Sequence, residues 1–411
     1  MKKLLLIIGA ILISTTPSLI AQQITLKGQV SIHNSKYETG TIEYVQSAFA
    51  TAPFADSDET DIEGKFGLTF VGIDAGTEVK VSVEKAGLEL VNDYDLRQVI
   101  IGRKPLLRVY LTKKGKLATA QTELFNISKK ALFAQKDALI ARLQGSEQEK
   151  KAALQELETK LGIEIGDVAT AIELLDSKIE NLEKRLPEFA QKMAKVNLDF
   201  ASDLYISAYE YFKKGEIEKA ILVLDDAQLE ISYQTAISTI AEGEKLQDVG
   251  KDLEEKGLLQ LNQIIESYEL KAESYSLLFQ YQSATEVYEK IVRILKESKG
   301  DETLELADAY RTLGGLYRDL GEFQKAYRYF EQNLSIKESL LDSMDSDLAT
   351  SYNNLAIIYQ DLGDYQKALI TQQKALSIRE QVYEANHPNI CLLYTSPSPR
   401  DATLSRMPSS A

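Results

Sequence analysis

The sequence predicts a multidomain protein: an N-terminal all-β sandwich, a helical hairpin or coiled-coil spacer, and a C-terminal all-α solenoid of helix pairs. Three patterns predict this order. Apolar residues alternate with polar ones from 23 to about 113, step by three and four residues from 172 to 196, and recur every 42 residues after about 201. Because each pattern suits a different packing, we expect three structural parts.

Charge and residue usage limit the classes of partner. The 411 residues include 47 Lys and Arg against 62 Asp and Glu, a formal net charge of −15. Because nucleic acid attracts basic surfaces, we expect no nucleic-acid partner. After the N-terminus there is no run of about 18 apolar residues, so we expect no membrane span in the mature chain.

The first 21 residues have the layout of a secretory signal peptide. Lys2 and Lys3 give a cationic start, an apolar run follows from Leu4 to Ile13, and Ala21 is a small residue at the cleavage position. We therefore expect 1–21 to be removed and the protein to be exported, into the periplasm or the medium of a bacterium. An uncleaved anchor is the alternative.

Residues 391–411 differ abruptly from the rest of the chain. They are rich in Ser, Pro and Thr and contain the only cysteine, Cys391. Codons back-translated for Cys391–Asp401 and Ser405–Ala411 resemble the two ends of a sequencing adapter, while a disordered tail is the alternative. We expect a non-native, adapter-derived tail, and a natural protein that continues beyond Ile390.

Residues 22–114 are expected to form the β-sandwich. Apolar side chains follow the two-residue period of strands, and polar turns such as Asp61–Gly64 and Asp74–Gly76 separate them. The alternating residues are Ile24 and Leu26; Phe66, Leu68 and Phe70; Val79, Val81 and Val83; and Val109 and Leu111.

One hairpin in this region carries a family resemblance. The stretch Thr60–Leu68, with Lys27–Val30 before it and Gly76–Val79 after it, resembles carboxypeptidase-regulatory-like domains. The resemblance implies that Asp61 and Gly64 shape the turn and that the aromatic residue enters the core. It also implies a non-catalytic accessory module.

Residues 115–200 are expected to form the helical spacer. A heptad seam runs through Ile172, Leu175, Ile179, Leu182, Leu186, Phe189, Met193 and Val196, and an earlier seam through Leu154, Leu157 and Leu161. Two antiparallel helices within one chain and a dimeric coiled coil both fit, so self-association through this spacer stays open. Pro187 is expected to kink or restart the second helix because it lacks a backbone donor.

Residues 201–390 repeat themselves. Tyr310, Leu313, Tyr317, Leu320, Gly321, Ala326, Leu334, Ile336 and Glu338 recur 42 residues later as Tyr352, Leu355, Tyr359, Leu362, Gly363, Ala368, Leu376, Ile378 and Glu380. Weaker copies lie around Tyr268–Ile294 and Ala208–Ala227. Small residues allow close helix approach, and glycines such as Gly321 end the first helix in the left-handed conformation. Phe279 replaces that glycine, so we expect a distorted repeat there.

The repeats resemble tetratricopeptide repeats (TPRs). The 42-residue spacing, Asn353–Ala356 and His387–Pro388 resemble the kinesin-light-chain-type variant. The resemblance implies a superhelix whose first helices line a concave groove that binds a peptide or protein. It also implies that Asn389–Ile390 begins a further helix, so we expect the solenoid to be truncated.

The implied groove residues come from the first helix of two successive repeats. Arginine can bind carboxylates bidentately, and asparagine can pair with a peptide backbone. The alternative is a solvated helix face with intrahelical pairs. The predicted groove residues are Asp308, Arg311, Gly315 and Arg318, then Asn353, Asn354, Ile357 and Gln360.

Little in the sequence supports catalysis. His33 and His387 have no metal partner at a recognisable spacing, and the acidic cluster Asp56–Glu63 does not match the calcium-loop pattern. We therefore expect no catalytic residue, no cofactor and no metal in this part of the protein.

The functional prediction is an exported protein–protein interaction scaffold. The alternative is a sensory, signalling or protease protein whose effector domain lies in the missing C-terminal part. A third possibility is binding of cell-wall glycan by the sandwich.

Overall fold

The computed structural model forms two compact units, one comprising most of the chain up to residue 114 and the other comprising the residues from 115 onward. The described residues are 23–93, 96–97, 99–102, 106–246 and 251–382. The predicted signal peptide, the tail after Ile390 and His387 lie outside these residues.

The first unit consists of β-sheets. The largest has the strand order β4-β1-β9-β7, with β1 and β9 parallel and the other pairs antiparallel. Two smaller sheets have the orders β3-β2-β6 and β5-β8. The described strands are β1 (Gln23–Ile32), β2 (Phe49–Thr51), β3 (Asp58–Glu59), β4 (Lys65–Val71), β5 (Glu78–Val79), β6 (Ser82–Glu84), β7 (Leu88–Leu90), β8 (Val99–Ile100) and β9 (Leu107–Lys113), with the short helix α1 at Ser35–Thr39.

The sheets enclose one hydrophobic core. The alternation from Leu26 onward predicts its members correctly, because side chains two residues apart on a strand point to the same face. The predicted residues that are buried in it are Leu26, Phe66, Leu68, Phe70, Val79, Val81, Val83, Val109 and Leu111. His33 is also buried, and its backbone N–H donates to the carbonyl of Leu111 at 2.9 Å.

The predicted turn at 61–64 is held by one aspartate. The Asp61 Oδ1 accepts hydrogen bonds from the backbone N–H groups of Glu63 (2.8 Å) and Lys65 (2.9 Å). Gly64 has a φ of 71°, and a Cβ built on it would lie 2.2 Å from the carbonyl oxygen of Val30. The chain therefore passes so close to β1 that only glycine fits.

We predict that Gly64→Ala destabilises the β unit much more than Gly72→Ala. Gly72 has almost the same φ, 73°, but nothing lies within 4 Å of its built Cβ. Gly72→Ala therefore costs only the free energy of placing an alanine in the left-handed region, roughly 1–2 kcal/mol. The difference in stability between the two variants measures the clash with Val30. Hydrogen exchange of β1 and β4 measures both. Equal effects would contradict the close approach.

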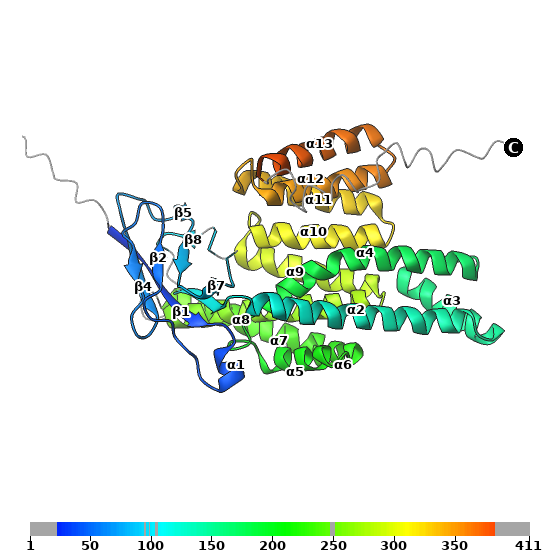
Figure 1. The fold of residues 1–411 in the computed structure, drawn as a ribbon, viewed down its shortest axis with the longest axis horizontal. Helices are drawn as coiled ribbons and strands as arrows, with labels where there is room; N and C mark the ends of the chain where they lie inside the picture. The colour runs from blue at the N-terminus through cyan, green and yellow to red at the C-terminus, as the bar shows by residue number, and fades with distance from the viewer. Residues whose placement is uncertain (1–22, 94–95, 98, 103–105, 247–250, 383–411) are drawn as a thin grey trace, which may run out of the picture. The chain divides into compact units, whose positions relative to one another are not determined.

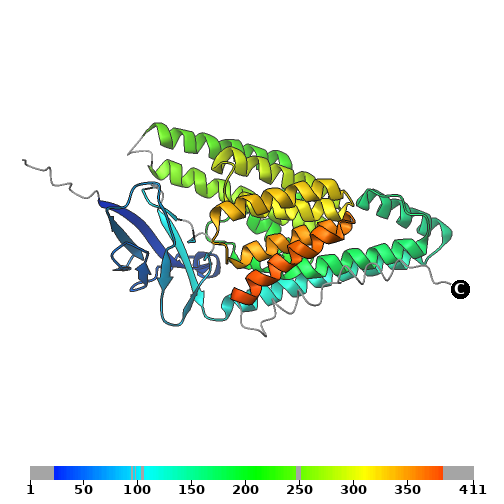
Figure 2. The same cartoon turned by 90° about the horizontal axis from the view of Figure 1, so that it is seen from above.

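In the described residues from 116 onward, every regular element is a helix. Figure 1 shows these helices, and Figure 2 shows them from above. They are α2 (Lys116–Leu143), α3 (Glu147–Leu161), α4 (Val168–Lys195), α5 (Asp203–Lys213), α6 (Ile217–Val223), α7 (Asp226–Lys245), α8 (Lys251–Leu277), α9 (Tyr281–Lys299), α10 (Leu304–Asp319), α11 (Phe323–Leu340), α12 (Ser346–Asp361) and α13 (Tyr365–Val382).

The predicted spacer region contains three helices where the sequence predicts two. The partner of α4 is mainly α2, which has no clean heptad, and Lys129–Glu183 (2.8 Å) and Lys136–Asp176 (2.6 Å) link the two helices. The heptad seam of α4 is buried within the same hydrophobic core as the repeats. The spacer helices are thus packed into the repeat region, and their seam is buried within one chain.

Helix α4 continues through Pro187 and does not restart there. Proline removes the hydrogen bond to the carbonyl four residues earlier, a loss that is tolerable where water replaces the donor. Pro187 lies on the exposed side of α4, between the buried Leu186 and Phe189, so water can reach this part of the helix.

Three helix pairs follow the predicted repeat: α8 with α9, α10 with α11, and α12 with α13. The small residues lie at close approaches, as predicted: a Cβ on Gly314 would lie 3.0 Å from the ring of Phe330.

The first copy of the repeat, around Ala208–Ala227, departs from this pattern. Its second helix, α6, ends at Val223, and Asp225 caps the long helix α7, which packs on α8.

The turn inside each helix pair has one geometry throughout. Gly215, Gly321 and Gly363 have φ values of 76°, 75° and 82°, and Phe279 has 60°. In each turn the next residue donates its N–H to the carbonyl of a tyrosine five residues earlier; the bond from Gln280 to Tyr275 is 2.9 Å. The distortion expected at Phe279 is therefore wrong for the turn, because the fully buried ring holds the residue in the left-handed region.

We predict that Phe279→Gly leaves the protein more stable than Phe279→Ala. Both lose the buried ring, at about 3–5 kcal/mol, but only glycine relieves the left-handed strain, by roughly 1–2 kcal/mol. Urea unfolding of the two variants measures the difference. A more stable alanine variant would contradict the backbone assignment.

Candidate partner-binding surface

The eight predicted groove residues are divided between two helices. Asp308, Arg311, Gly315 and Arg318 lie on α10, and Asn353, Asn354, Ile357 and Gln360 lie on α12. All eight are half-buried. The two sets differ in chemistry, because the α10 set is mainly charged and the α12 set is neutral.

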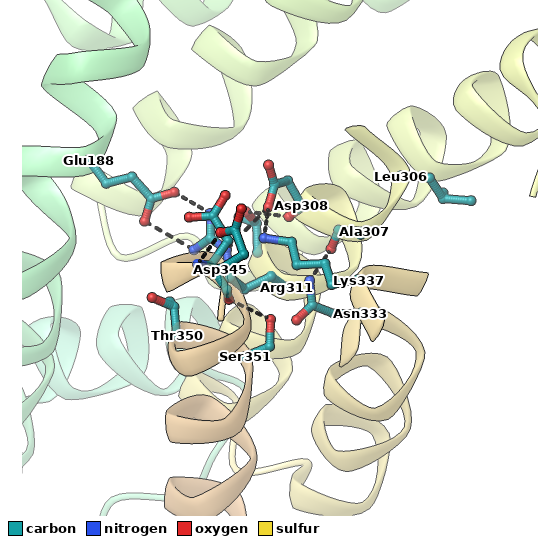
Figure 3. Close-up of polar contacts among 12 residues, drawn as sticks. Glu188, Leu306, Ala307, Asp308, Arg311, Asn333, Lys337, Asp345, Thr350 and Ser351 are labelled. Carbon is teal, nitrogen blue, oxygen red and sulfur yellow. Dashed lines mark hydrogen bonds and ion pairs between the residues drawn. The ribbon is translucent and has the colours of Figure 1, made fainter. Parts of the chain in front are cut away.

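Helix α4 binds one residue of the α10 set, Arg311. In Figure 3, Glu188 reaches from α4 to Arg311 on α10. The Nη1 of Arg311 donates to the Glu188 Oε2 at 3.0 Å, and its Nη2 donates to the Oε1, which makes the pair bidentate. Bidentate arginine–carboxylate pairs are among the stronger polar contacts in proteins. Arg311 is therefore bound to a carboxylate of its own chain.

The Arg311 side chain is also held from within the repeats. Its Nε lies 3.7 Å from the Asp308 Oδ1, and the same oxygen lies 2.8 Å from the Nζ of Lys337 on α11. Next to it, the Asn333 Nδ2 donates to the carbonyl of Ala307 at 2.8 Å. These contacts connect α10 and α11 and orient the guanidinium toward α4.

Three cationic side chains of α4 also contact α8 and α10. Arg185 lies 3.0 Å from Asp319 and 3.9 Å from Glu273, and Lys192 lies 3.6 Å from Glu269. Lys178 donates to the carbonyl oxygen of Asp319. Because later residues of α4 contact earlier residues of α8 and α10, α4 runs antiparallel to both.

The charges around Arg311 lower the pKa of two carboxyl groups, Asp308 and Glu188. Burial alone would raise the pKa of Asp308, but the charges of Lys337 and Arg311 outweigh it and lower that pKa to about 2. Burial likewise raises the pKa of Glu188, and Arg311 and Lys192 more than offset it, so this pKa lies below its ordinary value. Both groups are therefore ionised at neutral pH.

We predict that Asp308→Asn lowers the free energy of unfolding by at least about 2 kcal/mol at pH 7. A carboxyl group whose pKa is lower in the folded state than in the unfolded state stabilises the fold at pH values above its unfolded pKa, near 4. This contribution is lost as the pH falls to about 2, the pKa of Asp308 in the folded protein. The gap between wild type and variant should close over that range, as measured by urea unfolding. Asp342→Asn, on an exposed residue, is the control; a gap independent of pH would contradict the assignment.

The α12 set has free polar capacity. The Oδ1 of Asn353 is buried and accepts no hydrogen bond from the described part of the chain. Arg318 forms an ion pair with Asp361, which ties the end of α10 to the end of α12. Asn353 lies 42 residues after Arg311 and occupies the equivalent position on α12. The charge at this repeat position is therefore present on α10 and absent from α12.

The sequence reasoning missed the charged stripe of α4. Lys178, Arg185, Glu188 and Lys192 are spaced by seven, three and four residues, which places them along one face of a helix beside the apolar seam. The spacing indicates a charged helix face, but such a face is equally typical of a helix surface exposed to water. The sequence therefore does not connect this face with the repeats.

Other kinds of site are not found in the described ranges. They contain no group of three or more His, Cys, Asp or Glu residues that could hold a metal ion. None of their helices is long and apolar enough to cross a membrane. An open hollow of about 360 Å³ is lined by α9, α10 and α11, which contribute Val292, Leu313 and Tyr329 respectively.

Comparison with known proteins finds repeats in the second unit. Models of the tetratricopeptide repeat match residues 263–339 and 348–389. No curated protein matches the chain.

A search of solved structures gives matches over 44–46% of the chain. One is a protein from Podosopora anserina whose description names kinesin light chain and nearly identical TPR-like repeats, with 20% identity, 46% of this chain and 80% of that chain covered, and a TM-score of 0.33. Others are BtubC (BKLC) from P. vanneervenii, with 19% identity, 44% and 94% coverage and a TM-score of 0.31, and the MamA protein, with 19%, 45%, 94% and 0.25.

The matched segments coincide with the helix pairs α8 to α13, together with the residues that follow them up to 389. Residues 263–339 and 348–389 of this chain are therefore tetratricopeptide repeats.

Proposed function

We propose that the protein is an interaction scaffold that binds a peptide or protein segment on the α12 face. Tetratricopeptide repeats suggest protein–protein interaction, and scaffolds of this type are typically non-enzymatic. The observation that carries the choice of α12 is the buried Oδ1 of Asn353, which lacks a donor from the described residues. A buried acceptor without a donor is costly, and rotation of the half-buried Asn353 side chain would bring this oxygen to a partner's N–H.

The neighbouring amides fit a peptide main chain. Asn354 and Gln360 are half-buried on the same helix, and each side-chain amide offers two donors and an acceptor. A peptide backbone has the complementary groups in every residue. The α10 face has a different role, because Arg311 is already bound to Glu188.

We predict that Asn354→Ala with Gln360→Ala reduces partner capture at least tenfold without lowering stability by more than about 1 kcal/mol, since half-buried positions tolerate truncation. The measurement is quantitative mass spectrometry of proteins retained from an extract of the source cells. The matched control replaces the exposed amides Gln366 and Gln373 on α13. Equal retention by both double variants would argue against the α12 face.

Export and an accessory role for the β unit are part of the same proposal. The cationic and apolar pattern of 1–21 supports export. The turn built by Asp61 and Gly64, with Phe66 in the core, supports a carboxypeptidase-regulatory-like sandwich. Mass spectrometry of the protein from its native cells should give an N-terminus at Gln22. A protein that keeps Met1 would contradict cleavage.

A further inference from the structure

The face of α8 and α10 that contacts α4 is pre-organised by the repeats themselves. Asp308 and Lys337 position Arg311, and the Tyr288 hydroxyl donates to the Glu273 carboxylate at 3.5 Å. Asp319 is almost fully buried, with 5% of its side chain exposed. The contacts of Asp308 and Tyr288 lie within the repeats, so this part of the charge pattern is set without α4. Asp319 is also contacted by Arg185 and Lys178 of α4.

Helix α4 matches this face residue by residue. Its carboxylate Glu188 faces Arg311, Arg185 faces Asp319 and Glu273, and Lys192 faces Glu269. These three charges on α4 thus meet opposite charges on α8 or α10, which is the complementarity expected of a specific interface. On the α4 side the contacts are partly solvated, since 45% of the Glu188 side chain and 37% of Lys192 are exposed.

We propose that the face of α8 and α10 is a helix-binding site with α4 as its resident occupant. Its partner class is an amphipathic helix with the pattern Arg-x-x-Glu-x-x-x-Lys on one stripe, as at residues 185–192. A helix satisfies its own backbone hydrogen bonds, so the site recognises it only through side chains three, four and seven residues apart.

The site is distinct from the α12 face of the proposed function. The positions on α12 that are equivalent to Arg311 and Asp308 are occupied by the uncharged residues Asn353 and Thr350. A helix that follows the pattern stays on α8 and α10 and competes with α4. The Lys192–Glu269 pair is partly exposed and contributes little by itself, so the preference of this face for one helix over another depends mainly on the Glu188–Arg311 and Arg185–Asp319 pairs.

The test uses the full chain and a fluorescent peptide of residues 168–195, which is α4 itself. Glu188→Arg in the chain places a cation against Arg311 and should loosen the resident helix. The wild-type peptide should then bind this variant at least tenfold more tightly than it binds the wild-type chain, as measured by fluorescence anisotropy. Glu180→Arg is the matched control, because Glu180 lies on the same helix and, among the described residues, pairs with Lys184 of α4 alone.

A charge reversal separates recognition from loss of folding. Arg311→Glu in the chain should bind the peptide that carries Glu188→Arg and reject the wild-type peptide, the opposite preference to the Glu188→Arg chain. A misfolded chain cannot reverse its preference. Binding that ignores the charge at 188, or no binding to either loosened chain, would overturn the proposal. Neither result bears on Asn354 and Gln360, so the α12 proposal is tested separately.

Discussion

The bidentate ion pair between Glu188 and Arg311 links α4 to the repeats. Arg311 lies where α4, α10 and α11 meet, and a guanidinium at such a position needs carboxylates on more than one side. Asp308 supplies one from within the repeat, and Glu188 supplies the other from α4. Once this pair forms, α4 lies antiparallel on the repeats, and its apolar seam joins their core. The same contact leaves α12 as the part of the predicted groove with free polar groups.

The repeats were predictable because their chemistry is local and periodic. Tyr317, Gly321 and Ala326 recur at a fixed spacing, and each has its own packing reason, so one sequence contains several examples of the same structure. Strand alternation worked in the β unit for a similar reason, since Leu68 and Val109 point to one face by geometry alone. The choice of the predicted groove residues followed from the register of the repeat.

What periodicity cannot supply is the pairing of distant segments. The seam of α4 indicates a buried face but not which elements cover it, and its main partner α2 has no clean heptad. The charge at Glu188 looks like any solvated glutamate until Arg311, 123 residues away, is placed beside it. At Phe279 a local rule was overridden by tertiary packing, because burial of the ring compensates for a backbone conformation that favours glycine.

A double-mutant cycle of Glu188→Ala and Arg311→Ala, followed by urea unfolding, tests the central claim most directly. If the bidentate pair seats α4 on the repeats, the two changes should be coupled by about 1–3 kcal/mol. The parallel cycle of Glu180 and Lys184, an exposed pair within α4, should give less than about 0.5 kcal/mol. Additive effects at Glu188 and Arg311 would contradict the account and return Arg311 to the set of residues open to a partner.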